Sequence, residues 1–502
     1  MLLEFIARQM TQQASGVASK ASAPGATLTH RLYRVLRQTI VQSMARSGER
    51  LPSNRVLANR LGLARNTVVR ALAQLEAEGY VETRQGSGTF VRFHLPQHKL
   101  VTHANGSFEP EAPRHVSQRG ANLLHHTNAD QLEIEPFTRG TADFSPFPTG
   151  LWQRLQNKHW RLSYADMFDF NDSGGFSPLK RAIAQYLRLS RSMTLETDQV
   201  LVTTGTQQSL TLCAMLLSDP GDVAWVEDPL YWGAAQTLRA NGLRLHGLAV
   251  DAHGLNLAET ELAPPARLIY VTPSHQYPTG GVLSLERRHA LLQRSRAMQA
   301  WVLEDDYDSE FHFAGSPMPA LHGLDVHSQV FYMGTFSKAL YPGIKMAYLV
   351  VPSAWVHAFQ RVHYDLHRPG LMHQQVAMAE FIEMGHFHAT IQRARQHYGE
   401  RRQALLQALS HCLGSKAHIS GAEQGLHLCV HLPHMINDVA LAQQAREQGI
   451  TVRALSRYAV DRKTPKGLVI GYGYAPLEAI QRDGPVLAHL IARALESVRF
   501  NP

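Results

Sequence analysis

The 502-residue sequence has few cysteines, no long apolar run and no compact metal-binding motif. Its cysteines, Cys213, Cys412 and Cys429, lie far apart and lack C-x-x-C spacing, which argues against a disulfide framework and indicates a reducing compartment such as the cytoplasm. No apolar run approaches the ~18 residues that a membrane span requires, and we expect no signal peptide. The 28 histidines are scattered without an H-E-x-x-H motif, so we expect no metal site.

Excess positive charge is confined to the start of the chain. Residues 1–92 contain 13 Lys and Arg against 5 Asp and Glu, whereas the rest of the chain holds 36 of each sign, so the net charge of +8 belongs to the first fifth. Nearly all of these basic residues are Arg, whose guanidinium forms paired hydrogen bonds with phosphate and guanine. A basic face can also serve solubility alone, so charge by itself leaves both interpretations open.

Residues 28–92 have the pattern of a longer helix, two short helices and a β-hairpin. Ser53 can cap the first short helix and Gly62 ends it, after which a tight turn leads into the second. Helices joined by such a turn form a helix-turn-helix, and the second helix enters the major groove of DNA. The strand, Gly-rich turn and strand of residues 80–92 predict a wing beside it.

Polar residues at the start of the second short helix, together with the wing, are the predicted DNA contacts. They lie away from the stripe of apolar residues that the helix would bury. An alternative is a small helical cap that packs on the rest of the protein, which the Arg-rich exposed face makes the weaker interpretation. The predicted DNA-binding residues are Ser53, Arg55, Arg65, Asn66, Thr67, Arg70, Arg84 and Gly86.

Composition divides the remaining chain. Residues 1–27 are predicted to form a disordered tail because their second half is rich in Ala, Ser and Gly. Residues 93–136 lack periodicity and predict a linker, partly ordered near ANLLHH. From Phe137 onward strand-like and helical runs alternate, which predicts a largely parallel α/β sheet with ligand sites at the carboxyl ends of its strands.

Polar motifs follow five of these predicted strands. The first would place the N–H groups of Gly205, Thr206 and Gln207 at a helix N-terminus, where a phosphate can bind. Another ends a strand in Glu304, Asp305 and Asp306, three carboxylates that suit a metal, a cationic partner or a solvated loop. The motifs are TTGTQQSL (203–210), EDPLYW (227–232), VTPSHQYPTG (271–280), WVLEDDYDSEF (301–311) and YMGTFSKALYPGIKMAY (332–348).

Two family resemblances follow from these motifs. Residues 51–91 resemble the winged helix of the GntR superfamily over their full length, and the five motifs in this order resemble the core of fold-type-I aminotransferases, which binds pyridoxal 5'-phosphate (PLP). Together they resemble the MocR subfamily of GntR regulators. The resemblance implies a winged helix-turn-helix at 28–92 and, over 137–502, a mainly parallel sheet flanked by helices with a smaller C-terminal α+β subdomain.

The resemblance also implies roles for single residues. Lys338 would hold PLP through a Schiff base, Asp305 would pair with the pyridinium nitrogen, and Tyr307 would contact the ring hydroxyl. The phosphate would lie against Gly205, Thr206, Gln207, Thr335 and Ser337, the ring against Tyr231, and an effector carboxylate against Arg457.

The sequence departs from the family pattern at three positions. Ala64 stands where the family usually has a helix-capping Ser, and Lys345 stands where it usually has an Arg near the phosphate. Tyr277 replaces the Asn that usually bonds the ring hydroxyl, so His275 or Gln276 would have to substitute for it.

The expected function is that of a PLP-dependent, DNA-binding transcriptional regulator. The resemblance implies a domain-swapped homodimer on paired half-sites of double-stranded DNA, with PLP or an amino-acid or amine effector changing DNA affinity. One alternative is a working PLP-dependent aminotransferase with an appended winged helix. A regulator that has lost PLP is another, against which the intact Lys338 speaks.

Overall fold

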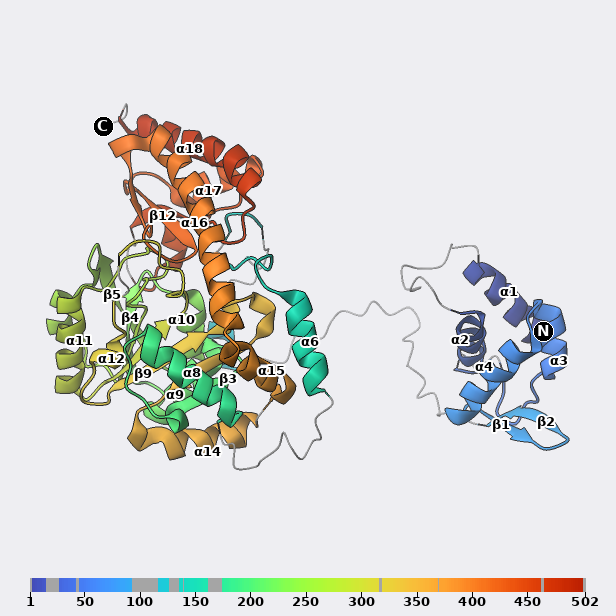
Figure 1. The fold of residues 1–502 in the computed structure, drawn as a ribbon. Coiled ribbons are helices and arrows are strands. Elements are labelled where there is room, and N and C mark those ends of the chain that lie inside the picture. The colour runs from blue at the N-terminus through green and yellow to red at the C-terminus, as the bar shows by residue number, and fades with distance from the viewer. Residues whose placement is uncertain are drawn as a thin grey trace. The chain divides into compact units, whose positions relative to one another are not determined.

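The computed structural model describes residues 2–14, 27–41, 45–92, 116–125, 135–138, 140–160, 174–315, 318–368, 370–461 and 465–499. The chain divides into two compact units, Met1–Arg114 and His115–Pro502 (Figure 1). Among the described residues, no helix combines the length and apolar character that crossing a membrane requires.

The first unit is a bundle of helices with a β-hairpin. Leu36, Leu57, Val68 and Leu75 are almost fully buried in its core, one or two from each main helix. The strands of the hairpin are antiparallel, with Val81 opposite Val91. The elements are α1 (Leu2–Ala14), α2 (Leu28–Val41), α3 (Asn54–Leu61), α4 (Arg65–Ala77), β1 (Val81–Arg84) and β2 (Gly88–Val91).

Helix α1 shows that the prediction of a disordered tail is wrong for residues 2–14. Apolar residues recur there at helical spacing, at Leu3, Ile6 and Met10, and the Ile6 side chain is fully buried in the core that α2 and α3 share. Burial of this stripe stabilises a helix that composition alone does not predict. Residues 15–26 of the predicted tail lie outside the described residues.

Part of the predicted linker is also helical. Helix α5 (Gln118–His125) packs on α10 (Trp232–Ala240), and the Gln236 side chain donates a hydrogen bond of 3.4 Å to the carbonyl of Leu123. The other linker residues, except 116–117 and 135–136, are not among those described.

An eight-stranded sheet forms the centre of the second unit, in the order β3-β10-β9-β8-β7-β4-β5-β6. The central strands β9, β8, β7, β4 and β5 are parallel, and β3, β10 and β6 pair antiparallel at the edges, which confirms the predicted, largely parallel sheet. The strands are β3 (Val200–Thr203), β4 (Val223–Asp228), β5 (Arg244–Asp251), β6 (Gly254–Leu255), β7 (Leu268–Val271), β8 (Trp301–Asp306), β9 (Val330–Thr335) and β10 (Ala347–Val350).

Helices cover both faces of this sheet (Figure 1). Because strand side chains alternate, Val200 and Val202 of β3 pack in the core with α8, while Leu201 packs in the core with α9. The helices are α6 (Thr149–His159), α8 (Ser177–Ser190), α9 (Thr206–Leu217), α10, α11 (Leu285–Met298), α12 (Leu321–Leu324), α13 (Phe336–Ala339), α14 (Val356–His367) and α15 (Met372–Glu383).

A smaller α+β subdomain follows, as the resemblance implies. Helix α16 (His386–Leu413) runs from the large sheet into it (Figure 1). Its antiparallel sheet has the order β11-β12-β14-β13 and packs with two further helices. The elements are β11 (His418–Ser420), β12 (His427–Leu432), α17 (Asp438–Glu447), β13 (Arg453–Ala454), β14 (Lys466–Gly471) and α18 (Leu477–Arg499).

Candidate functional site

A cavity of about 500 Å³ lies at the carboxyl ends of the parallel strands in the second unit. Most of the residues predicted for a cofactor site line it, and they come from four of the five motifs. These are Gly205, Thr206, Gln207, Tyr231, Asp305, Tyr307, Thr335, Ser337, Lys338 and Lys345. The topology explains this convergence, because parallel strands end at the same edge of the sheet.

The N-terminus of α9 opens onto the cavity. Gly205 is the N-cap residue of α9 and has no side chain that could accept a hydrogen bond from the first turn. The preceding loop is held instead by Gln208, whose side-chain oxygen accepts from the N–H of Thr204 at 2.7 Å. The first N–H groups of a helix have no partner within it, so those of α9 can bind an anion in the cavity.

Short helix α13 presents the lysine. The Thr335 hydroxyl caps it by accepting from the N–H of Ser337 at 3.1 Å, and Lys338 follows within the same turn. The Lys338 ammonium donates to the carbonyl of Gly140 at 2.5 Å. Lys345, with a left-handed φ of 47°, adds a second cation to the wall of the cavity.

The three consecutive carboxylates at the end of β8 do not converge on one point. Asp305 lines the cavity, and alternation along the strand turns Glu304 and Asp306 to the opposite face of the sheet. Glu304 accepts from the N–H groups of Leu321 and His322, both at 2.9 Å, and so caps α12.

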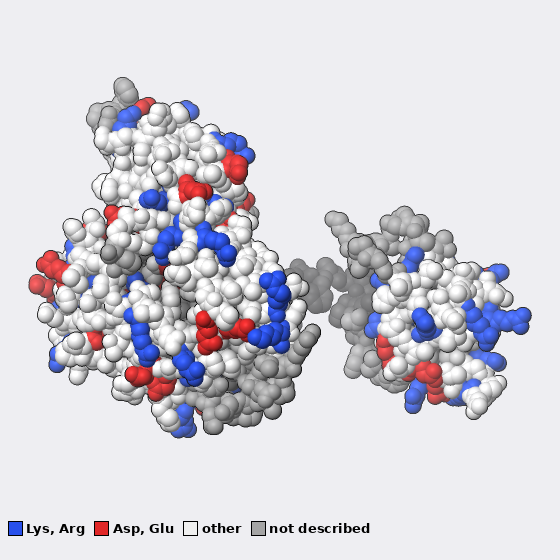
Figure 2. Space-filling view, viewed as in Figure 1, with Lys and Arg blue, Asp and Glu red and all other residues white. Residues whose placement is uncertain are grey.

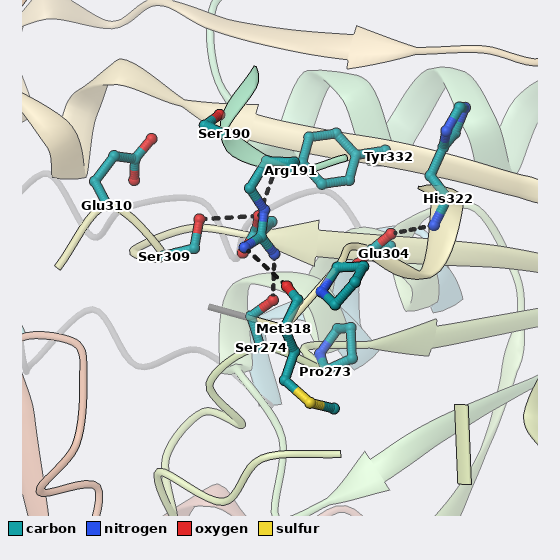
Figure 3. Close-up of polar contacts among 12 residues, drawn as sticks. Ser190, Arg191, Pro273, Ser274, Glu304, Ser309, Glu310, Met318, His322 and Tyr332 are labelled. Carbon is teal, nitrogen blue, oxygen red and sulfur yellow. Dashed lines mark hydrogen bonds and ion pairs between the residues drawn. The ribbon is translucent and has the colours of Figure 1, made fainter. Parts of the chain in front are cut away.

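Asp306 belongs to a buried network of ion pairs and hydrogen bonds on the face of the sheet opposite Asp305. Its carboxylate pairs with Arg191 at 2.8 Å and accepts from the Tyr332 hydroxyl at 2.5 Å. Arg191 also donates to the Ser274 hydroxyl at 2.6 Å and to the carbonyl of Met318, so it ties the loop after β7 to the end of β8 (Figure 3). This pairing satisfies a charge that would be costly to bury alone.

Asp305 has one carboxylate oxygen that accepts a hydrogen bond and one that does not. Its Oδ2 accepts from the Tyr270 hydroxyl at 2.8 Å, while its buried Oδ1 has no partner among the described residues. Burial raises the pKa of Asp305 to about 7, with neighbouring Asp306 adding to the rise. A cationic N–H donor in the cavity would satisfy Oδ1 and favour the ionised carboxylate.

His275 and Gln276 do not line the cavity, so the structure does not bring them to the place of the missing Asn. His275 is buried behind the wall against Asp308, and Gln276 donates to the carbonyl of Pro229 at 2.9 Å. Tyr277 itself faces the cavity. Tyr270 also lines it and was missed, because an aromatic residue inside an apolar strand looks like core.

Arg457 does not line the cavity either. Its side chain is exposed, while its neighbour Tyr458 is buried and lies 3.2 Å from the hydroxyl of Tyr277. Within the described lining, the cationic side chains are Lys338 and Lys345.

In the first unit, the start of α4 is exposed. Arg65, Asn66 and Arg70 face solvent there, while Val68 packs in the core. Ala64 occupies the N-cap position of α4, and its methyl side chain cannot form the capping hydrogen bond. Figure 2 shows Lys and Arg side chains at several places on the visible face of this unit. The exposed Arg side chains suit an interface with phosphate and base edges.

Two other predicted DNA contacts, Ser53 and Arg84, have partners within the first unit, whereas Arg55 is exposed. Ser53 caps α3 by accepting from the N–H of Val56 at 3.3 Å. Arg84 donates to Glu82 at 2.7 Å and stacks on Phe90, whose ring centre lies 4.7 Å away. Gly86, with a φ of 75°, lies in the exposed turn of the hairpin.

Comparison with known proteins assigns both units. Residues 28–91 match the family described as "Bacterial regulatory proteins, gntR family", and residues 152–468 match "Aminotransferase class I and II". The "Probable rhizopine catabolism regulatory protein MocR" of Rhizobium meliloti is 37% identical over 446 residues, 88% of this chain and 89% of that protein. The HTH-type transcriptional regulator TauR of Rhodobacter capsulatus is 31% identical, over 86% and 90%.

Solved structures agree on the fold of the second unit. A kynurenine aminotransferase from Pyrococcus horikoshii has a TM-score of 0.66 at 21% identity, covering 77% of this chain and 96% of that one. The α-aminoadipate aminotransferase LysN from Thermus thermophilus has a TM-score of 0.65 at 24% identity, covering 76% and 96%. The chain belongs to the MocR family of GntR-type transcriptional regulators, in which a winged helix precedes an aminotransferase-like domain.

Proposed function

We propose that this chain binds PLP in the cavity of its second unit and that the bound state controls the affinity of the winged helix for DNA. The observation that carries the first part is the unpartnered, buried Oδ1 of Asp305 in a cavity that also holds a lysine and an uncapped helix N-terminus. These are the acceptor, the amine and the anion site that PLP requires.

Each part of PLP has a matching group in the cavity. The α9 N-terminus, Thr335 and Lys345 would hold the phosphate, and Asp305 would accept from the ring nitrogen. Tyr231 offers an aromatic face to the ring, and Lys338 an amine to its aldehyde. When bound, PLP supplies a reactive aldehyde and an electron-withdrawing ring.

Relatives support this assignment. The regulator PdxR of Corynebacterium glutamicum, 29% identical over 88% of this chain, is named for pyridoxine biosynthesis. The LysN structure holds N-(5'-phosphopyridoxyl)-L-leucine, a PLP group joined to an amino acid. An amino acid or amine is accordingly the effector class that we propose for the cavity.

DNA binding is the proposed output. Helix α4 would present Arg65, Asn66 and Arg70 to base edges, and the hairpin would contact the backbone. We also propose a domain-swapped homodimer, since two winged helices would match paired half-sites. Double-stranded DNA as partner places the proposed activity in the cytoplasm.

A gel shift with DNA from upstream of the chain's own gene, beside an absorbance spectrum with added PLP, tests both halves. We expect specific retardation that a scrambled fragment does not show, and a visible absorbance band that dialysis does not remove. Absence of the band would contradict PLP binding, and equal affinity for the scrambled fragment would contradict specific recognition.

A working aminotransferase is the second candidate, favoured by the presence of both Lys338 and Asp305 in one cavity. It predicts repeated amino transfer between an amino acid and a 2-oxo acid. Tyr277 in the wall and the exposed position of Arg457 favour the regulator instead, because neither provides the contact with ring hydroxyl or carboxylate that an aminotransferase uses. Multiple turnovers per site would support the enzyme.

A further inference from the structure

A buried group of polar side chains lies directly behind the cavity residue Tyr307. His275, Asp308 and His427 are each at most 1% exposed, and their nearest ligand atoms lie within 4.8 Å of one another. His275 Nδ1 lies 3.0 Å from Asp308 Oδ2 and 3.1 Å from the Tyr307 hydroxyl. One ring nitrogen thus joins a buried carboxylate to a side chain of the cavity.

These contacts determine the proton positions. A carboxylate accepts hydrogen bonds, so His275 must carry its proton on Nδ1, between itself and Asp308. The Tyr307 oxygen then shares that proton as an acceptor. Its own proton is left to point elsewhere, and the cavity is the open side of Tyr307.

Tyr307 is also held in its protonated form. Burial, and then the nearby Asp308 carboxylate, raise the pKa of Tyr307 well above its ordinary value. It therefore remains a hydrogen-bond donor at neutral pH. The Tyr307 hydroxyl can therefore donate a hydrogen bond to an oxygen of a bound ligand, but it cannot pair with a cation.

The smaller subdomain fixes His275 from the other side. Glycines at 280, 421 and 425 surround the imidazole, and a Cβ at Gly425 would lie 2.0 Å from its Cε1. Burial lowers the pKa of His427 well below its ordinary value, so this ring is neutral and donates from Nε2 to the carbonyl of Pro278 at 3.1 Å. The imidazole of His275 has no room to rotate.

We propose that Asp308 and His275 are positioning residues, which orient the Tyr307 proton toward the ring oxygen of a bound PLP. The inference rests on the proposed function and concerns the ring-hydroxyl contact of Tyr307, which remains in this chain where the Asn contact is missing. His275 then serves the ring hydroxyl through Tyr307 rather than by direct contact.

Hydrogen bonds occupy one ring nitrogen of each histidine in this group. Asp308 already occupies Nδ1 of His275, and the carbonyl of Pro278 occupies Nε2 of His427. The other ring nitrogens, His275 Nε2 and His427 Nδ1, are buried and have no hydrogen-bond partner among the described residues. A metal that took His275 Nδ1 and Asp308 as ligands would have to replace the hydrogen bond between them.

The test is a pH titration of the visible absorbance band of the PLP-loaded full chain. A donor to the ring oxygen favours its ionised form, so losing the donor raises the apparent pKa of the band. We expect Tyr307→Phe, His275→Gln and Asp308→Asn each to raise it by about one unit, a tenfold change in proton affinity. His431→Gln on β12, a histidine that bonds Ser420 instead, should leave it unchanged.

Coupling between the variants makes the result specific. In the double variant Tyr307→Phe, His275→Gln, the second change should add little, because both act through one hydrogen bond. A wild-type pKa in His275→Gln and Asp308→Asn, or full additivity in the double variant, would overturn the inference. The isosteric Asp308→Asn keeps the test informative if the histidine variant does not fold.

Two further outcomes are distinguishable. A wild-type chain without any visible band would overturn the proposed function itself, whereas a shifted band only in Tyr307→Phe would overturn the positioning role alone. A pKa that changes on adding Zn²⁺ or EDTA to the loaded wild type would contradict the hydrogen-bonded arrangement in favour of a metal.

Discussion

Asp305→Asn removes the charge of this side chain and keeps its shape. In the wild type the Tyr270 hydroxyl occupies Oδ2, so Oδ1 is the atom available to a bound ring nitrogen. A hydrogen bond to a charged group contributes about 1.5–3 kcal/mol. At about 1.4 kcal/mol per factor of ten, its loss should lower PLP affinity about 10- to 100-fold.

The assay is an equilibrium titration of purified protein with PLP, followed by absorbance. Glu304→Gln is the matched control, since Glu304 is the preceding residue of β8 but faces away from the cavity and caps α12. It should leave PLP affinity unchanged. Wild-type affinity in Asp305→Asn, or an equal loss in both variants, would refute the assignment of Oδ1 as the PLP contact.

Four other predictions test the remaining assignments. Lys338→Ala should abolish the visible band in a folded protein, and a persisting band would exclude Lys338 as the Schiff-base residue. Arg65→Ala should weaken specific DNA binding in gel shifts by about 1–3 kcal/mol and leave PLP affinity unchanged, whereas intact DNA binding would mean that α4 is misassigned. Ala64→Ser restores a capping hydroxyl and should stabilise the first unit against urea by about 1 kcal/mol, so a lower midpoint would contradict the capping argument. Ile6→Ala should destabilise the same unit by about 2–5 kcal/mol, and an unchanged midpoint would show that α1 does not share its core.

The predicted site residues that line the cavity lie at the ends of regular elements. Asp305 ends a strand and Gly205 begins a helix, so the parallel topology alone brings both to one edge of the sheet. Lys338 follows the next strand in the same way. Apolar periodicity likewise predicted the helices of the winged unit.

The residues that the sequence predicted wrongly or missed lie in irregular segments or in apolar surroundings. Within residues 271–280 no period tells which side chains face inward, so the burial of His275 behind the wall and the exposure of Tyr277 to the cavity depend on packing against the smaller subdomain. Tyr270 has the sequence pattern of a core residue, and only the structure shows that its hydroxyl donates to Asp305 on the neighbouring strand. The helix at residues 2–14 required a partner surface that composition does not reveal.

The central claim is that the cavity and the winged helix are coupled. The direct measurement is the affinity of the full chain for its own upstream DNA, with and without saturating PLP, in one buffer and salt concentration. We expect the DNA affinity to change about 5- to 150-fold, the range that typical coupling free energies give, and the PLP affinity to change by the same factor when DNA is present. Identical DNA affinity in both conditions, with the visible band present, would contradict the claim.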